Sequence, residues 1–419
     1  MLRGSERMRR YMREGAAFGR WVLYAAFLGV AVGLVGVAFL LGIDWATGLR
    51  GRYPQLILML PLVGVSTVLM YRIFGMERDR GTNLVLVAVR EAEPIRLRTA
   101  PLIFLSTILT HLAGGSAGRE GAALQLGGSL AAYAGRKMGL DEKDGRVMVM
   151  CGMAAAFSAL FGAPLTAAVF AMEVVSVGVM YYAALVPCLV SAQVALLVAR
   201  MFGVHRGVPY PVGDSLPLAP AAMLQVAALG LLCALVSILF CKAVHAAPKL
   251  YARALPGPVV RAAVGGVLVL ALTVLLGEQT YNGAGDAAMR QMLAGETIPA
   301  AFLWKILFTA LTLGAGFRGG EIVPVLFTGC AFGTLAGPVL GLPHGFSGAL
   351  GMAGVFCGAT NCPISSILLS YELFGGENLP LYALCVGISY MLSGYYGLYG
   401  EQKIVYSKFR TEWVDKKAE

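Results

Sequence analysis

The stretch GGSAGREGAALQLGGSLA, residues 114–131, joins a glycine-rich turn to a short apolar helix and places Arg119 and Glu120 between them. The glycines of this turn are Gly114, Gly115, Gly118 and Gly121. Glycine lets the backbone adopt left-handed conformations and approach a ligand closely. The first N–H groups of the helix that follows lack intrahelical partners and lie at the positive end of the helix dipole. The stretch therefore predicts an anion-binding turn.

Glu120 places a carboxylate inside this predicted anion site. When ionised, it can occupy the site as a tethered anion, and when protonated it can leave. Burial favours the neutral form of a carboxyl group, so such a residue can take up and release protons. An alternative interpretation is a membrane helix with a glycine-rich packing face and a capping carboxylate.

The composition places the chain in a lipid bilayer. Hydrophobic residues make up 58% of the sequence and charged residues 13%, and the mean hydropathy is +0.73. These values are typical of a polytopic membrane protein. Four segments are long and apolar enough to cross the hydrocarbon: Trp21–Leu41, Pro54–Phe74, Ala183–Phe202 and Ala221–Phe240.

Two further regions, 99–180 and 299–396, contain shorter apolar runs. Glycine, proline or a charged residue interrupts each run, as in helices that end within the membrane. Broken helices are tolerated at that depth only where protein buries them or where they line a watery cavity. These regions are therefore expected to form the functional interior.

The net charge of +10 does not indicate nucleic-acid binding, because the basic residues cluster at the ends of apolar segments. They act as topology signals and predict that both termini are cytoplasmic. The basic segment 1–20 is expected to be retained, since the apolar segment after it is of span length. The eight cysteines lie in apolar sequence and are expected to be small buried side chains. We expect neither a metal site nor a cofactor.

The chain also repeats itself at one fixed offset. Phe157, Pro164 and Glu173 in FSALFGAPLTAAVFAME recur as Phe356, Pro363 and Glu372 in FCGATNCPISSILLSYE. Arg119 likewise recurs as Arg318, and the offset is 199 in each case (318 − 119, 363 − 164, 372 − 173). Duplicated halves with interrupted helices predict a substrate site where the halves meet. The residues leave the relative orientation of the halves open, and the two glutamates are expected to serve helix packing.

Together these features resemble the CLC family of anion channels and proton-coupled anion exchangers. Four motifs carry the resemblance: GREGA at 118–122, GEIVP at 320–324, GAPLTAAVFAME at 162–173 and GLYG at 397–400. The resemblance implies an all-α polytopic membrane fold of two inverted repeats, with about eighteen tilted and broken helices in each subunit of a homodimer.

The resemblance also implies a domain division. It predicts a transmembrane domain over 21–406, with halves of approximately 21–203 and 219–406. Residues 407–419 are expected to form a short cytoplasmic tail without a regulatory domain.

Three departures point to one branch of that family. The turn GTNLV at 81–85 has Thr82 at the position of the family's chloride-binding serine, and Glu321 replaces an apolar residue. Val174 stands where chloride–proton exchangers carry an inner glutamate for proton transfer. These changes resemble the fluoride-handling branch, whose members exchange fluoride for protons, although Val323 replaces a threonine found in some of them.

The resemblance then assigns candidate site residues. Glu120 is predicted to be the gate and proton carrier, and Glu321 a candidate for the proton pathway. The predicted anion-binding residues are Thr82, Asn83, Gly118, Arg119, Gly121, Ala122, Ile322, Val323, Phe327 and Tyr399.

Other roles are open for five of these residues. Pairing with a carboxylate or with helix-end carbonyls is favoured for Arg119 over direct anion binding. Glu321 can hold its own turn, and Asn83 can cap the helix that follows. Tyr399 can belong to an interfacial tyrosine belt, and Phe327 can serve ordinary packing instead of presenting a ring edge to the anion.

The predicted function is export of cytoplasmic fluoride in exchange for protons across the cell inner (plasma) membrane. The expected partners are fluoride, protons and the lipid bilayer, with chloride as a further candidate and no nucleic acid. A chloride–proton exchanger or a passive anion channel on the same fold is the alternative. An intramembrane enzyme is disfavoured, because Ser116 has no histidine at a spacing that suggests a nucleophile and its base.

Overall fold

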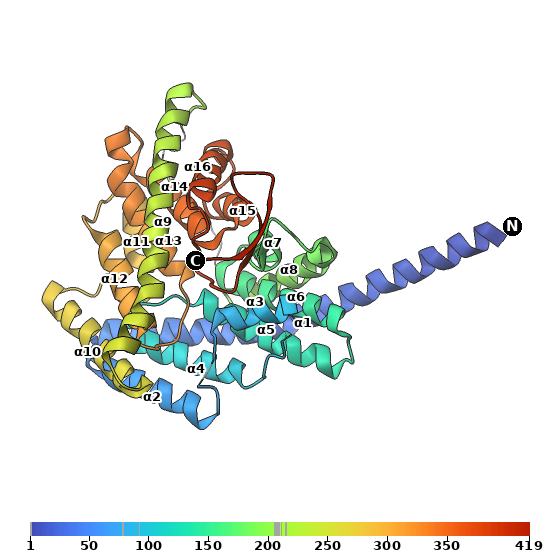
Figure 1. Cartoon of the computed structure of the whole chain (residues 1–419), viewed down its shortest axis with the longest axis horizontal. Helices are drawn as coiled ribbons and strands as arrows, with labels where there is room; N and C mark the ends of the chain where they lie inside the picture. Colours follow the sequence, from blue (N-terminus) through green and yellow to red (C-terminus); the bar gives the residue numbers. More distant parts are fainter. Residues whose placement is uncertain (1, 78, 92, 205–209, 211, 214–215) are drawn as a thin grey trace.

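The computed structural model describes every residue except 1, 78, 92, 205–209, 211, 214 and 215, and it is a bundle of helices of very unequal length (Figure 1). The elements of the first half are α1 (Leu2–Arg52), η1 (Pro54–Met59), α2 (Leu60–Ile73), α3 (Thr82–Glu91), α4 (Thr99–Leu112), α5 (Glu120–Lys137), α6 (Glu142–Phe161), α7 (Pro164–Glu173), β1 (Ser176–Val177), η2 (Tyr182–Ala184) and α8 (Leu185–Met201).

The elements of the second half follow in the same pattern of long and short helices. They are α9 (Pro220–Ala254), α10 (Pro258–Leu276), α11 (Asp286–Leu293), α12 (Ala301–Gly314), α13 (Ile322–Ala336), η3 (Pro338–Leu340), α14 (His344–Thr360), α15 (Pro363–Phe374), α16 (Leu379–Leu392), β2 (Lys403–Tyr406) and β3 (Trp413–Lys417).

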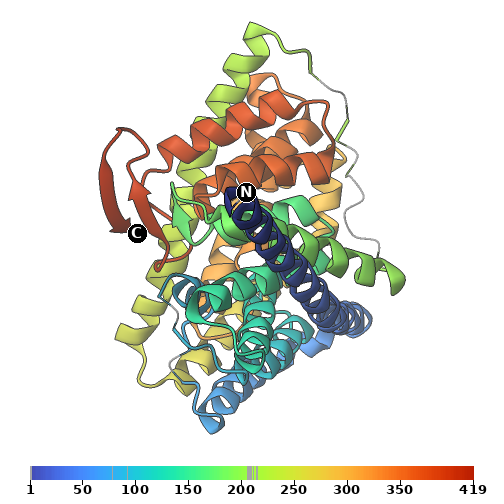
Figure 2. The same cartoon turned by 90° about the vertical axis from the view of Figure 1, so that its right-hand side faces the viewer.

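Seven helical segments within the described residues are long and apolar enough to cross a membrane. The four predicted spans are confirmed, and the first is part of one continuous helix, α1, whose N-terminal end projects away from the bundle (Figures 1 and 2). The three spans that were not predicted from the sequence are Glu142–Phe161, Pro258–Leu276 and Ile322–Leu340. The first and third are mostly buried by other helices, so their small residues and glycines serve packing between helices.

Among the short apolar helices, α7 is mostly buried. Helices α4, α12, α15 and α16 each keep exposed apolar side chains, so the interrupted runs lie only partly inside the bundle. The repeat-related helices α7 and α15 both begin with the proline of the repeat and pack against each other. The C-terminal glutamate of each accepts hydrogen bonds from the first turn of the other, so the two helices lie antiparallel. Antiparallel packing of equivalent helices is what two inverted repeats require.

The C-terminal region departs from the all-α expectation. Strand β2 pairs in parallel with β1 and antiparallel with β3, which forms a small three-stranded sheet at one edge of the bundle (Figure 2). The β-branched residues of the sequence KIVY in β2 favour the extended conformation. The sheet ties the last residues of the chain to the segment that follows α7.

The eight cysteines confirm their expected role. All are free and buried, and they lie within the helical core.

Candidate functional site

Two glycine-rich turns, the first central turn at residues 114–118 and the second central turn at residues 316–320, meet in the interior of the bundle. Gly118 N–H donates to the Gly320 carbonyl at 2.6 Å, and Gly320 N–H donates to the Gly118 carbonyl at 2.8 Å. This antiparallel bridge joins the start of α5 to the start of α13. A Cβ atom on Gly320 would lie 2.5 Å from Gly121 N, so only glycine permits this approach.

Glu120 is the first residue of α5 and is 1% exposed. Its Oε2 atom accepts a hydrogen bond from Arg119 N–H at 2.9 Å, and its Oε1 atom lies 3.3 Å from Arg119 Nε. The carboxylate therefore folds back over the start of its own helix, where the helix dipole and the neighbouring guanidinium group both stabilise a negative charge.

Arg119 pairs with carboxylates, as favoured from the sequence. In addition to Glu120, it contacts Asp286 Oδ2 at 3.4 Å and Asp44 Oδ1 at 3.9 Å. Asp44 and Asp286 are partly exposed, whereas Arg119 and Glu120 are buried. A charged network thus leads from the surface to the buried carboxylate.

Gly121 marks the point where three predicted site residues converge. A Cβ atom placed on it would lie 3.0 Å from Thr82 Oγ1, 3.1 Å from Glu321 Oε2 and 3.0 Å from Gly320 Cα. Thr82 is buried at the start of α3, and its hydroxyl donates to the Gly121 carbonyl at 3.4 Å. The turn at 81–85 and both central turns therefore contribute to one site.

The N-terminal ends of α5 and α13 point their first backbone N–H groups into this region. Ala122 lies in the first turn of α5, and Ile322 and Val323 lie in the first turn of α13. All three side chains are buried. Because the first N–H groups of a helix have no intrahelical acceptor, these two ends together are the candidate anion site.

Glu321 precedes α13, and its Oε2 atom is buried with no hydrogen-bond partner among the described residues. The fully buried Gln125 was missed from the sequence: its Nε2 atom lies 3.5 Å from Thr82 Oγ1 and 3.3 Å from the Gly121 carbonyl. Its spacing of four residues from Gly121 places it on the same face of α5, a signal that could have identified it.

Tyr399 is 1% exposed, so the interfacial belt interpretation is wrong for this tyrosine. Its buried hydroxyl has no hydrogen-bond partner among the described residues. Asn83 does not cap α3 either. It is the second residue of that helix, and its Oδ1 atom accepts from Glu401 N–H at 3.1 Å, which holds the segment of Tyr399 beside α3.

Phe327 lies one turn further along α13. Its ring centroid is 5.0 Å from Lys305 Nζ and 6.5 Å from the ring of Tyr281. The structure therefore brings Phe327 together with a buried lysine that no sequence motif indicated.

Arg318, the repeat equivalent of Arg119, also pairs with a carboxylate. Its Nη1 atom lies 2.9 Å from Oδ2 of Asp79, and its guanidinium group lies 4.1 Å from the ring centroid of Tyr71. The Asp79 side chain is fully buried and also accepts from Gly81 N–H at 3.2 Å. This pair ties the second central turn to the start of α3.

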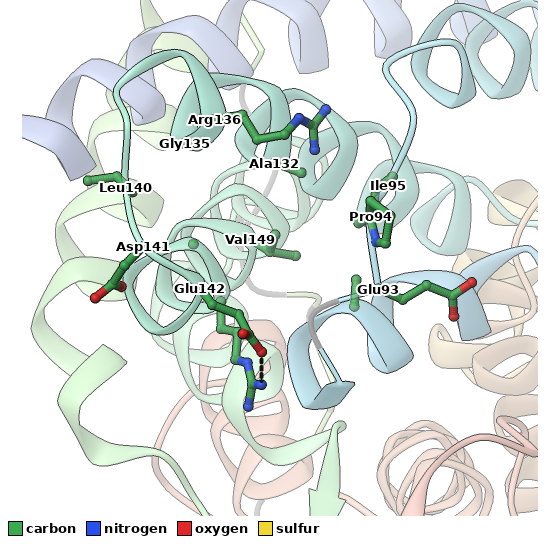
Figure 3. Close-up of a pocket in the computed structure, with 13 residues that line it drawn as sticks. Glu93, Pro94, Ile95, Ala132, Gly135, Arg136, Leu140, Asp141, Glu142 and Val149 are labelled. Atoms are coloured by element: carbon green, nitrogen blue, oxygen red, sulfur yellow. Dashed lines mark hydrogen bonds and ion pairs between the residues drawn. The ribbon is translucent and has the colours of Figure 1, made fainter.

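A separate hollow of about 170 Å³ lies between the ends of α5 and α6 and the segment 93–95 (Figure 3). Carboxylates and guanidinium groups both line it, and Glu142 forms an ion pair with Arg146 at 2.6 Å. It contains none of the predicted site residues, and its mixed charges give no preference for anions. The convergent turns are the better candidate site.

Comparison with known proteins shows which family this chain resembles. The sequence model of the family described as voltage gated chloride channel matches residues 62–394. A protein of Pseudomonas syringae pv. tomato named chloride/fluoride channel protein is 35% identical over 396 residues, which cover 93% of this chain and 87% of that protein. The voltage-gated ClC-type chloride channel ClcB of Escherichia coli O17:K52:H18 is 30% identical over 66% of this chain and 68% of its own length.

Solved structures show the same similarity. The crystal structure of a CLC-type fluoride/proton antiporter matches with a TM-score of 0.88 and 32% identity, covering 92% of this chain and 98% of that chain. A slow cyanobacterial Cl⁻/H⁺ antiporter matches with a TM-score of 0.72 at 18% identity, covering 89% and 94% of the two chains, and supports the fold alone. The fold and site define a multi-pass ion-transport protein rather than an enzyme. The chain belongs to the CLC family.

Proposed function

We propose that this protein is a secondary active transporter that exports cytoplasmic fluoride in exchange for protons. The observation that carries the proposal is the seat of Glu120: a buried carboxylate lies at the start of α5, next to the point where Thr82, Glu321 and the second central turn converge. The similarity to a solved fluoride/proton antiporter over nearly the whole chain supports the choice of ions.

Glu120 is the moving part of the proposed mechanism. In its ionised form the carboxylate occupies the start of α5, where Arg119 and the backbone N–H group stabilise it. Protonation removes that attraction, so the side chain leaves the site and a small anion replaces it at the helix ends. Return of the ionised carboxylate displaces the anion, and the released proton completes the exchange.

The neighbouring residues have separate proposed roles. Thr82, with its hydroxyl beside Gly121, and the N–H groups at the starts of α5 and α13 would hold fluoride. Tyr399 would offer its buried hydroxyl to the anion. Glu321 would accept or pass a proton, because its buried oxygen has no partner among the described residues and faces the same point.

The same proposal includes the membrane, the orientation and the oligomeric state of the transporter. The chain would lie in the inner (plasma) membrane with both termini cytoplasmic, as the basic residues at the ends of the spans favour. It would act as a homodimer with one pathway in each subunit. The transmembrane domain would extend over residues 21–406, with 1–20 and 407–419 as cytoplasmic segments.

Reconstitution into liposomes tests this function. The vesicles are loaded with fluoride or chloride, and anion efflux and proton uptake are recorded together. We expect fluoride efflux with stoichiometric proton uptake, and much slower chloride efflux. Equal efflux of both anions would indicate a chloride–proton exchanger, and fluoride efflux without proton uptake would indicate the passive channel that the name of the Pseudomonas relative suggests.

The variant Glu120→Gln tests the proposed gate in the same vesicles. Glutamine preserves the shape of the side chain but cannot carry a proton. We expect proton uptake to fall at least tenfold, whether or not fluoride still moves. Coupling as strong as in the parent would refute the role of Glu120. Replacement of Glu377 by glutamine is the matched control, because the Glu377 side chain is exposed and lies outside the site.

A further inference from the structure

Lys305 is a charged side chain inside the apolar sequence AFLWKILF of α12, and it is fully buried. Burying an ionisable side chain at such a position costs free energy, and such a residue usually serves a function. Its ammonium group donates to the carbonyls of Gly283 at 2.7 Å and Tyr281 at 3.2 Å. It also faces the ring of Phe327 at 5.0 Å, so Lys305 is bound by neutral groups alone in these contacts.

The two carbonyls belong to the loop 281–285, which lies against the first central turn. The Asn282 side chain donates from Nδ2 to the Gly114 carbonyl at 2.8 Å, and Gly283 N–H donates to the Gly115 carbonyl at 3.1 Å. These two hydrogen bonds therefore hold the loop 281–285 against the turn 114–118. Lys305 supplies the hydrogen-bond donor for the two loop carbonyls, which would otherwise be buried without a partner.

The same loop leads directly into α11, whose first residue is Asp286. Asp286 contacts Arg119, and Arg119 contacts Glu120. Two routes thus connect Lys305 to the carboxylate. One is the pair of hydrogen bonds between the loop and the turn, and the other is the chain of ion pairs that begins where the loop ends.

We propose that Lys305 is a positioning residue for Glu120, because it holds the loop 281–285 against the turn 114–118 and keeps Asp286 in place to anchor Arg119. This role rests on the proposed function of Glu120 in transport. In its ammonium form Lys305 would also add a positive charge to this buried region, which favours an ionised carboxylate.

The inference predicts a change in pH dependence when the lysine charge is removed. Without the positive charge of Lys305, and with Arg119 held less firmly, the ionised form of Glu120 is less stable. Glu120 is then protonated at higher pH, so the pH at which proton-coupled transport is half-maximal increases. The other titratable groups around this region are Asp44, Arg50, His111, Tyr210, Tyr281, Glu321 and Tyr399. They stay unchanged in the variants below.

The experiment compares Lys305→Met and Lys305→Arg with the parent, and Lys249→Met serves as a control because Lys249 is exposed. Amide hydrogen exchange is measured in the segments 278–286 and 112–119, and the pH profile of fluoride-driven proton uptake is measured in liposomes. For Lys305→Met we expect at least tenfold faster exchange in both segments and a midpoint higher by roughly half a pH unit or more. Lys305→Arg and Lys249→Met are expected to stay close to the parent.

Two results would overturn the positioning role. One is unchanged exchange in the segment 112–119, and the other is faster exchange with an unaltered pH midpoint, which would make Lys305 merely structural. If Lys305→Met does not fold, Asn282→Ala removes one loop–turn hydrogen bond without changing charge, and the same acceleration of exchange is required. A parent that does not couple fluoride to protons would refute the proposed function, while the exchange measurement would still decide whether Lys305 positions the turn.

Discussion

Glu173 and Glu372 cap each other's helices. The carboxylate of Glu173, at the end of α7, accepts from Ile364 N–H at 3.0 Å and Ser365 N–H at 2.8 Å in the first turn of α15. The carboxylate of Glu372, in the last turn of α15, accepts from Leu165 N–H and Thr166 N–H at 2.9 Å each in the first turn of α7. One interaction is thus made twice, by two residues that are 199 positions apart in the chain.

This relationship predicts an unequal effect of the two substitutions to glutamine. A glutamine places an NH₂ group against backbone donors and removes the charge that favours a helix start, so each variant should lose about 1–3 kcal/mol of stability. Glu173→Gln should cost more than Glu372→Gln, since the Glu173 side chain is more deeply buried. Thermal unfolding in detergent measures both, and an equal or smaller loss for Glu173→Gln would contradict this account.

Because Gly121 has no side chain, a methyl group added at this position tests the site sterically. Gly121→Ala would place a methyl group about 3 Å from Thr82 Oγ1, Glu321 Oε2 and Gly320 Cα. We expect fluoride transport to fall at least tenfold, because the three groups must move apart. Gly387→Ala in α16 is the control: its added methyl group meets no atom within 4 Å, so transport should be retained. Parent-level transport by Gly121→Ala would remove this point from the pathway.

The buried pair Arg318 and Asp79 predicts a loss of stability that an exposed pair does not show. Asp79→Asn leaves the guanidinium group without its charged partner, at a cost of about 2 kcal/mol or more. The nearby pair Arg72–Glu77 has a similar separation of 3.0 Å, but both side chains are more than half exposed. Arg72→Gln should therefore cost less than about 0.5 kcal/mol.

A double-mutant cycle separates this pairing from other effects of the substitutions. Arg318→Met and Asp79→Asn, alone and combined, should show a coupling energy of about 1 kcal/mol or more in denaturant unfolding. Additive losses would mean that the contact contributes nothing to stability.

Lys408 predicts a pH dependence of stability in the C-terminal region. Its Nζ atom donates to the Tyr390 carbonyl at 2.9 Å and to Ser393 Oγ at 3.1 Å, and burial lowers the pKa of its ammonium group to about 8. Between this value and the ordinary lysine pKa of 10.5, the unfolded chain binds more protons than the folded chain. The free energy of unfolding contributed by Lys408 therefore rises with pH across that window, by up to about 3 kcal/mol.

The variant Lys408→Met isolates this contribution from all other titrations. Thermal midpoints of parent and variant are compared at several pH values, and the parent should gain relative to the variant as the pH rises from about 8 to about 10. A constant difference across that range would show that the ammonium group is not affected by its burial.

The sequence alone predicted the features that depend on local composition and backbone chemistry. Apolar spans such as Pro54–Phe74 follow from the thickness of the bilayer, and the anion-binding turn at Glu120 follows from glycine next to a helix start. The fixed offset between Arg119 and Arg318 is enough to indicate two related halves. Each of these signals lies within a short stretch of chain or in a comparison of two such stretches.

Only the tertiary structure decided which distant groups meet. The inverted orientation of the halves became visible in the mutual capping of α7 and α15, because a repeat in sequence carries no direction in space. Arg119 pairs with Asp286, which lies 167 residues further along the chain. Lys305 binds the loop 281–285, which no local sequence pattern connects to the turn 114–118. A buried charge must take its partner from whatever the packing brings near it, so these pairings are properties of the folded bundle and not of any segment.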